Sequence, residues 1–291
     1  MNDSENRSLF ADGSARGGDT APEGGPVHET GGGAAPIDMA AVRRAAASLR
    51  ARVSEACRAA GVADDDGWLT ERVRPEFGGY QEFVAELCGN ADPDHVPLIP
   101  ELCARALGEA ARTARALTGD QRLAEPFFHH GDLLVKGHLD ILAPFVVTGS
   151  LTVEGCLADC GPDSVVAVGG DMTARAVHTD GEMSVGGALG ADVVYGQYND
   201  QTLQAAAIRA RLVVEDDHCT IAAVEAETHF DLDDFQQGYG DGVQDRLREL
   251  LVDEVFGYEE DEGEERLDRT LLFARLREGR QVFRTNGATA H

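Results

Sequence analysis

A seven-residue block recurs in the middle of the chain and constrains its fold more than any other feature. Residues 131–137 read GDLLVKG, residues 149–155 read GSLTVEG and residues 181–187 read GEMSVGG. Each block begins and ends with glycine and alternates polar and apolar residues, and the first two begin 18 residues apart. A fixed period of this length is typical of a β-solenoid, in which each turn buries its apolar face against the next turn.

The matched offset predicts which side chains lie inside the solenoid. Leu133 and Val135 align with Leu151 and Val153, so we expect these four side chains on adjacent turns, pointing into the core. Eighteen residues fit three sides of about six residues each, and residues 123–232 supply five or six such turns. Residues 156–162 interrupt the pattern, which predicts a short excursion there.

The segments on either side of the repeats have different compositions. Residues 1–36 are rich in Gly, Ser, Asp and Pro without apolar periodicity, which predicts a disordered tail. Residues 37–122 carry two apolar stripes at helical spacing, which predict a helical domain with helices over 39–61 and 103–119. The fold class expected is therefore α+β, a single-stranded parallel β-helix flanked by helices.

The C-terminal segment, residues 233–291, is acidic and helical in pattern. Apolar stripes over 243–255 and 267–279 predict two helices, and the run of residues 259–265 is charged enough to predict a flexible link. We expect these helices to cap the end of the solenoid, because an uncapped last turn exposes a row of unpaired backbone groups.

The charge balance limits the partners that this chain can have. Fifty-two Asp and Glu residues against 25 Lys and Arg residues give a formal net charge of −27. Such a field repels nucleic acid and anionic membrane surfaces and favours a partner protein with a basic surface.

The chain has no apolar run long enough to span a bilayer. Its six cysteines are scattered without a CxxC pair, which favours reduced thiols and a cytoplasmic location.

The basic residues of the first predicted helix have two interpretations. They form either a solvated helix face or a contact surface for the acidic C-terminal third of the chain. The residues concerned are Arg43, Arg44, Arg50, Arg52 and Arg58.

Scattered histidines and cysteines raise the question of a zinc site. His138 lies 18 residues before Cys156, an offset that would stack the two residues on adjacent turns, with Cys160 and His178 on the following turns. His129 and His130 precede the first repeat, but no pair of ligands has a recognised metal-binding spacing. We therefore expect no metal and no cofactor.

Two segments are candidates for contact with a partner. Residues 194–200, VYGQYND, interrupt the repeat pattern, and tyrosines in a loop on a rigid scaffold suit a recognition surface. The acidic run would steer a basic partner towards the protein. The predicted partner-binding residues are Tyr195, Tyr198, Asn199, Asp200, Glu259, Glu260, Asp261 and Glu262.

The glycine-flanked repeats resemble those of the bactofilins, the polymer-forming cytoskeletal β-solenoids of bacteria. The resemblance rests on the three blocks quoted above and covers roughly 100 residues of the chain. It implies the solenoid fold and possible self-association. The chain departs from the family pattern in its helical N-terminal part, in residues 195–200 and in its long acidic C-terminal part.

Three functions follow from these observations. We expect a non-enzymatic scaffold that binds another protein, because no nucleophile, metal or phosphate-binding motif is present in the sequence. One alternative is an acyltransferase of the hexapeptide-repeat kind, in which His138 or His178 would be catalytic. The other alternative is an acidic inhibitor or immunity-like protein that covers a basic active site.

Overall fold

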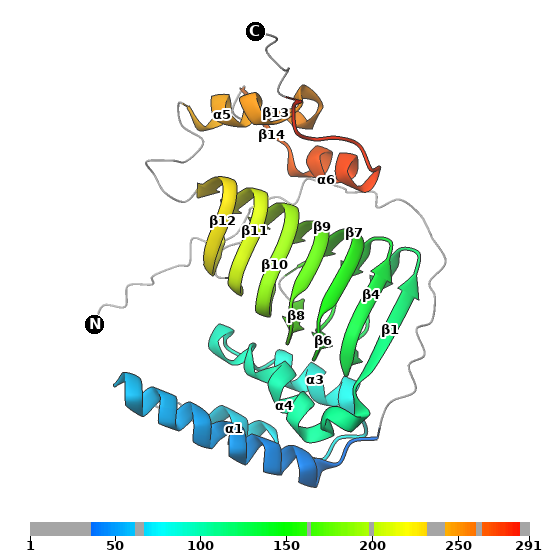
Figure 1. Ribbon diagram of the computed structural model, residues 1–291, viewed down its shortest axis with the longest axis vertical. Coiled ribbons are helices and arrows are strands. Elements are labelled where there is room, and N and C mark those ends of the chain that lie inside the picture. Colours follow the sequence, from blue (N-terminus) through cyan, green and yellow to red (C-terminus); the bar gives the residue numbers. More distant parts are fainter. Residues whose placement is uncertain are drawn as a thin grey trace, which may run out of the picture. The chain divides into compact units, whose positions relative to one another are not determined.

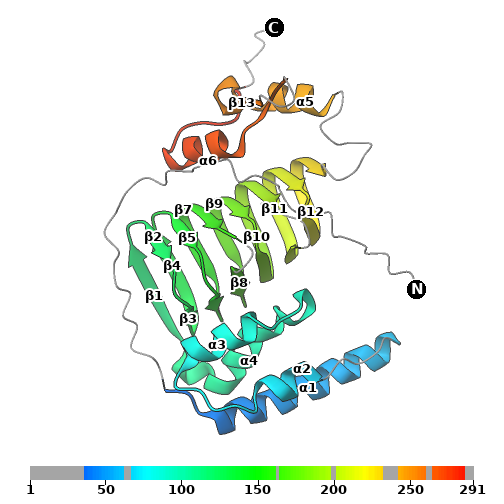
Figure 2. The ribbon, with the colours of Figure 1, turned by 180° about the vertical axis from the view of Figure 1, so that it is seen from behind.

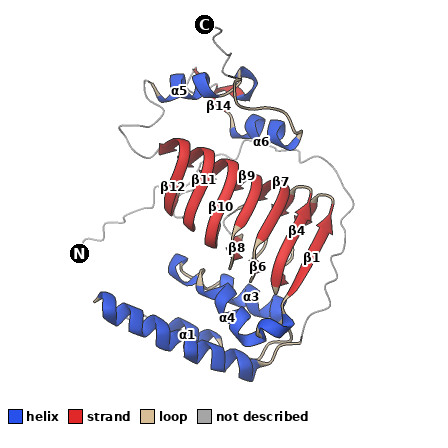
Figure 3. Cartoon of the chain, in the orientation of Figure 1, coloured by secondary structure: helices blue, strands red, loops and turns tan. Residues whose placement is uncertain are grey.

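The computed structural model describes residues 36–61, 67–161, 164–197, 201–231, 242–259 and 264–285. Almost all of the predicted tail, residues 1–35, lies outside the described residues. The described part consists of an N-terminal group of helices, a parallel β-solenoid and a C-terminal segment with two helices and a small hairpin (Figures 1 and 3).

The predicted solenoid is confirmed and extends from Thr113 to Asp231 in about six turns. All of its strand pairs are parallel, and Leu133 pairs with Leu151 while Val135 pairs with Val153. Its strands are β1 (Thr113–Thr118), β2 (Gln121–Leu123), β3 (Phe127–His129), β4 (Gly131–Lys136), β5 (Leu139–Ile141), β6 (Phe145–Val147), β7 (Leu151–Asp159), β8 (Val165–Val168), β9 (Met172–Thr179), β10 (Glu182–Gln197), β11 (Thr202–Asp216) and β12 (Cys219–Asp231).

Each turn has three sides, and the successive turns stack them into three faces. The open face consists of β1, β4 and the first halves of β7 and β9, continued by the middle of β10, β11 and β12. The C-terminal face consists of β2, β5 and the ends of β7 and β9 to β12, and the helical face consists of β3, β6, β8 and the starts of β10 to β12. Figure 2, seen from behind, labels β2, β3 and β5, which Figure 1 leaves unlabelled.

The interior is a continuous apolar column built from every turn. The predicted core residues Leu133, Val135, Leu151 and Val153 are all at most 2% exposed and belong to this column. Phe145 stacks on Phe127 of the preceding turn with ring centroids 5.1 Å apart. The alternation of inward apolar and outward polar residues therefore gives each turn a core that only the neighbouring turns complete.

Glycine is required where the backbones of two turns meet at the corner before the open face. Gly131 has a φ of 122°, and a Cβ atom there would lie 1.9 Å from the carbonyl oxygen of Thr113. A Cβ atom on Gly149 would lie 2.5 Å from the backbone of Gly131. The repeated glycine thus marks a close backbone contact that no other residue could make without moving a turn.

One detail of the predicted repeat is wrong. Residues 156–159 do not leave the solenoid, because β7 continues through them and pairs with β5 and β9 after a register shift between Val153 and Cys156. The block at residues 181–187 lies on another face than the first two blocks, because Met183 pairs with Val166 on the helical face. The open face repeats at Gly187 and Leu189, and Leu189 pairs with Met172.

The N-terminal helices cover the helical face. Tyr80 stacks on Phe128 of β3 with centroids 4.7 Å apart, and one apolar cluster joins the helices to Val146 and Ala167 of the solenoid. The helices are α1 (Met39–Ala60), α2 (Gly67–Arg72), α3 (Tyr80–Cys88) and α4 (Leu98–Leu107), with the 3₁₀ turns η1 (Pro93–His95) and η2 (Glu109–Ala111).

The first predicted helix is confirmed and the second is wrong in its second half. Asp38 caps α1 by accepting hydrogen bonds from the backbone N–H groups of Ala40 and Ala41, and Gly61 ends the helix with a φ of 71°. The second helix ends at Leu107, and the residues expected to continue it form the 3₁₀ turn η2 and the strand β1. Pairing of β1 with β4 along its whole length outweighs the helical spacing of its apolar residues.

The C-terminal segment covers the C-terminal face rather than capping the end of the solenoid. Its buried residues form one apolar cluster with outward side chains of successive turns, such as Ala176, Val193 and Leu212. The charged run was expected to be a link, but its two ends pair as antiparallel strands, and residues 260–263 lie outside the described residues. The elements are α5 (Val243–Leu250), the 3₁₀ turn η3 (Asp253–Val255), β13 (Phe256–Glu259), β14 (Glu264–Leu267) and α6 (Arg269–Arg277).

The core column makes a direct prediction for stability. Val153→Asp places an unpaired charge at a position that is 2% exposed, so we expect a loss of about 3 kcal/mol or more in the free energy of unfolding. Thr152→Asp is the matched control, because Thr152 is the exposed neighbour on the same strand. Chemical denaturation of both variants measures the difference, and equal losses would contradict the assignment of the interior.

Candidate functional site

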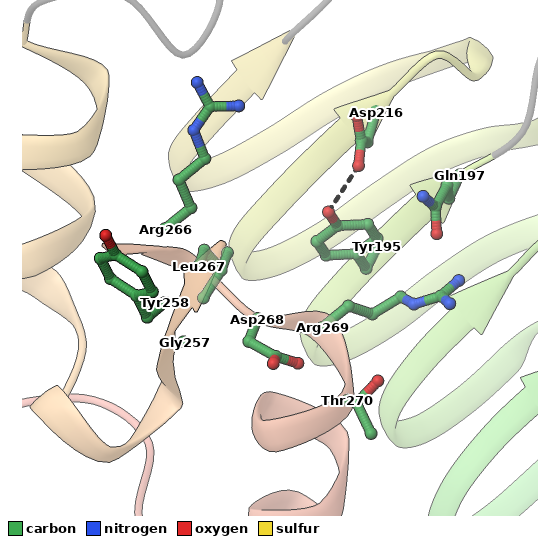
Figure 4. A pocket seen from close by; sticks show the side chains of 10 residues that line it. All are labelled: Tyr195, Gln197, Asp216, Gly257, Tyr258, Arg266, Leu267, Asp268, Arg269 and Thr270. Carbon is green, nitrogen blue, oxygen red and sulfur yellow. Dashed lines mark hydrogen bonds between the residues drawn. The ribbon is translucent and has the colours of Figure 1, made fainter. Parts of the chain in front are cut away.

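Of the predicted partner-binding residues, the structure describes Tyr195 and Glu259. Tyr195 is not in an exposed loop, because it lies in β10, is 2% exposed and donates a hydrogen bond from its hydroxyl to Asp216 at 2.7 Å (Figure 4). Tyr198, Asn199 and Asp200 lie outside the described residues, as do Glu260, Asp261 and Glu262. Glu259 ends β13, on the C-terminal segment.

Tyr195 lines a cavity of about 490 Å³ between the solenoid and the C-terminal segment (Figure 4). Asp216 and Gln197 approach it from the solenoid, and Tyr258 and Arg269 approach it from the C-terminal segment. Tyr258 is 65% exposed at its rim. The lining combines both signs of charge with two phenol rings, a polar surface without a cluster of like charges.

Beside this cavity, Arg269 holds α6 against the solenoid. Its Nη1 atom lies 3.0 Å from Oδ1 of Asp180 and 2.8 Å from Nε2 of His178. The ring of His178 also packs against Phe273 of α6, with centroids 5.3 Å apart. His178 is 9% exposed, so this candidate catalytic histidine is covered by the chain's own C-terminal segment.

His138, the other candidate catalytic histidine, is held by the backbone on both sides. Its Nδ1 atom accepts a hydrogen bond from the N–H of Cys156 at 2.9 Å, so the proton is on Nε2, which donates to the carbonyl oxygen of Arg277 at 3.1 Å. The predicted stacking of His138 and Cys156 on adjacent turns is confirmed. Both ring nitrogens are therefore occupied, and the bond from Nε2 to Arg277 joins α6 to the solenoid.

The cysteine and histidine side chains that could bind zinc are not arranged as a metal site. Among the described residues, no group of three or more His, Cys, Asp or Glu side chains could hold a metal ion. Burial raises the pKa of the Cys156 thiol to about 11, which disfavours the thiolate that binds zinc.

Asp159, a residue that the sequence did not single out, carries a buried carboxyl group at the end of β7. Asp159 is 0% exposed, and its Oδ2 atom lies 2.8 Å from the Thr179 hydroxyl, which lies 3.0 Å from the carbonyl oxygen of Gly181. The hydroxyl has one hydrogen for these two oxygens. A protonated Asp159 resolves the conflict, because it donates to the hydroxyl, which then donates to Gly181. Burial raises the pKa of Asp159 to about 7, in agreement with this geometry.

The arginines of α1 bind within the N-terminal helices. Arg43 forms an ion pair with Glu76 and donates from Nε to the carbonyl oxygen of Val73 at 3.0 Å, and Arg52 forms an ion pair with Glu101. The partners described for these two arginines therefore come from α4 and from the connection between α2 and α3, and not from the acidic C-terminal third.

The open face presents side chains that are exposed or half-buried along the whole solenoid. Three of its charged residues, Lys136, Glu154 and Asp192, are exposed on three different turns. Its outward residues are Asp132, Leu134, Lys136, Thr152, Glu154, Thr173, Arg175, Gly190, Asp192, Arg209, Arg211, Glu225 and Glu227.

Comparison of the chain with protein-family models, with curated proteins and with solved structures finds no match. The resemblance to the bactofilins stays a prediction that rests on the repeated blocks. Within the part of the chain that the structure describes, no helix is long and apolar enough to cross a membrane.

The state of Asp159 can be tested by its effect on stability at different pH values. Its folded pKa, about 7, is above the ordinary value of 3.8, so the stability that its proton contributes is complete below pH 3.8 and is lost as the pH rises to 7. Asp159→Asn keeps the shape without the charge. The difference in the free energy of unfolding between this variant and the wild type measures the effect of the charge. We expect this difference to favour the variant by roughly 2 kcal/mol more at pH 7.5 than at pH 5.

Urea denaturation at the two pH values measures this difference. Glu154→Gln removes one charge from the exposed open face and serves as the control. A gain by Asp159→Asn that is the same at both pH values would show that Asp159 is ionised in the folded protein.

Proposed function

We propose that this chain is a non-enzymatic scaffold that binds another protein through the open face of its solenoid. The observation that carries the proposal is that the chain covers two faces of its solenoid with its own segments and presents exposed polar and charged side chains on the third. A rigid, nearly flat sheet surface that continues over about six turns suits an extended protein contact.

The positions of the histidines support a scaffold over an acyltransferase of the hexapeptide-repeat kind. That alternative needs a histidine that a substrate can reach, and His138 uses both ring nitrogens in backbone hydrogen bonds. His178 is covered by Arg269 and Phe273 of α6. The candidate catalytic groups lie beneath the C-terminal segment, whereas the exposed surface lies on another face.

The partner proposed is a protein with a basic surface. The net charge of −27 favours a positively charged partner and accelerates its approach at low ionic strength. Glu259, Glu260, Asp261 and Glu262 stay in the proposal as steering charges rather than as contacts. The cytoplasm is the compartment proposed, because all six cysteines are free.

Charge reversal on the open face tests this proposal. The open-face pair is a double variant, Glu154→Arg with Asp192→Arg, that changes two exposed carboxylates of the open face. The control pair Glu55→Arg and Glu71→Arg makes the same change in charge on exposed positions of α1 and α2. Partners that the wild type captures from native lysate are identified by mass spectrometry, and purified partner is then titrated against each variant.

We expect the open-face pair to weaken binding of the purified partner by at least about tenfold, because a basic surface then meets repulsive charges. The control pair should retain binding within about threefold, and higher salt should weaken the wild-type complex by screening. Equal effects of the two pairs would show that only the net charge matters, and the open face would then not be the binding surface.

A further inference from the structure

The two ends of the solenoid differ in what they offer to an additional strand. Among the described strands, β12 pairs with β11 alone, so no described strand pairs with its other edge. The inward side chains of this last turn, Ala222, Val224 and Ala226, are partly buried and pack against the core column. Ile221 beside them is 54% exposed. The β12 edge therefore has no strand partner within the described residues and is apolar on its core side.

The first turn is different, because a charged residue occupies its core position. Arg115 pairs with Leu133 in register, so it takes the place in the column that leucine has on the next two turns. Its guanidinium carbon lies 5.7 Å from the ring centroid of Phe127. An inward charge on an edge strand opposes the addition of an apolar strand. The end at β12 is thus the one that suits a further strand.

Charges on the open face alternate in sign from turn to turn and end at β12. The strand registers place the members of this charge ladder on successive turns, with Asp192, for example, between Arg175 on one side and Arg211 on the other. Arg211 forms an ion pair with Glu227 at 3.6 Å. The charge ladder runs Lys136, Glu154, Arg175, Asp192, Arg211 and Glu227.

A second row of the open face ends in the same way. Arg209 pairs in register with Glu225, and their side chains form an ion pair at 2.9 Å. Glu225 and Glu227 both point outward from β12, two residues apart, with the inward residue Ala226 between them. A strand added to this edge would bring its own outward side chains next to the two glutamates.

We propose that the β12 edge binds an extended segment of the partner protein in which apolar and basic residues alternate. The proposal rests on the protein-binding function proposed above and names the partner's recognition element. Backbone hydrogen bonds would add the segment as a further strand, and its apolar residues would pack on Ala222, Val224 and Ala226. Its Lys or Arg residues would lie beside Glu225 and Glu227 and continue the charge ladder.

The charge ladder also favours a basic partner segment over a second copy of the chain as the occupant of the β12 edge. Joining two β12 edges would set Glu225 and Glu227 against the glutamates of the other copy, and like charges opposite each other destabilise a strand pair. Joining β12 to the β1 of another copy would set Glu227 beside Thr118, because Thr118 pairs with Lys136 of the charge ladder, and Thr118 has no charge. The same contact would place Arg115 against the apolar core at β12. A basic partner strand meets neither obstacle.

Binding of synthetic peptides to the full chain tests the proposal. The first peptide alternates valine and lysine, and the second replaces each valine with proline, so it keeps the charge and loses the ability to pair as a strand. Both are titrated by fluorescence anisotropy against the wild type and two variants. One variant carries Glu225→Lys and Glu227→Lys at the edge, and the other carries Glu154→Lys and Asp192→Lys within the open face.

We expect the valine–lysine peptide to bind the wild type at least about tenfold more tightly than the proline–lysine peptide. The edge variant should lose at least about tenfold in affinity, while the variant within the open face should stay within about threefold of the wild type. Equal binding of the two peptides would overturn strand addition and leave only attraction between charges. Equal effects of the two variants would overturn the β12 edge as the site.

Sedimentation of the wild type and the edge variant completes the test. Self-association of the wild type that disappears in the edge variant would show that a second copy occupies the edge, which would overturn the proposal. Failure of the proposed function is distinguishable from failure at the edge. A purified partner that is released by Glu154→Arg with Asp192→Arg, and not by the edge variant, supports the open face and overturns the β12 edge.

Discussion

Parallel stacking of one turn on the next is the constraint on which the rest of this structure depends. The turns approach so closely at the corner before the open face that a Cβ atom on Gly149 would lie 2.5 Å from the backbone of Gly131. Every turn must also supply apolar residues at the same inward positions, because its core is completed by its neighbours. Extra residues are accommodated locally, as at the register shift after Val153, while the column of core residues continues.

This constraint explains which parts of the fold could be predicted from the sequence. The 18-residue offset gave Leu133 opposite Leu151 correctly, since a strict period encodes the register directly. The block at residues 181–187 matches the first two blocks in sequence yet lies on another face, because all three faces require the same alternation. The strand β1 was taken for a helix because its apolar residues fit helical spacing, and only its pairing with β4 decides between the two.

The candidate site was less predictable, because its contacts join segments that are far apart in the sequence. Arg269 meets His178 across 91 residues, and no periodicity relates an arginine in a C-terminal helix to a turn of the solenoid. Tyr195 was expected in a loop because glycine and asparagine follow it, yet it continues the strand register and is buried. The charge ladder could have been found from the sequence by comparing the signs of residues one turn apart, beginning with Lys136 and Glu154.

The flanking segments limit the surface of the solenoid that a partner can contact, because they cover two of its three faces. The C-terminal segment covers His138 and His178, and these two histidines and Asp180 hold the segment in place. What remains for a partner is a surface of charged residues and one strand edge. Ion pairs on such an exposed surface contribute little to stability, with a median near 0–1 kcal/mol. Alternating charges on adjacent turns are better understood as a means of specifying register, because a strand that shifts by one residue exchanges its inward and outward side chains. At β12 the outward charges would likewise specify the register of a strand added to its edge. Backbone hydrogen bonds at an open edge would accept almost any extended chain, and two glutamates at alternate positions restrict that choice to a strand with basic residues at the matching positions.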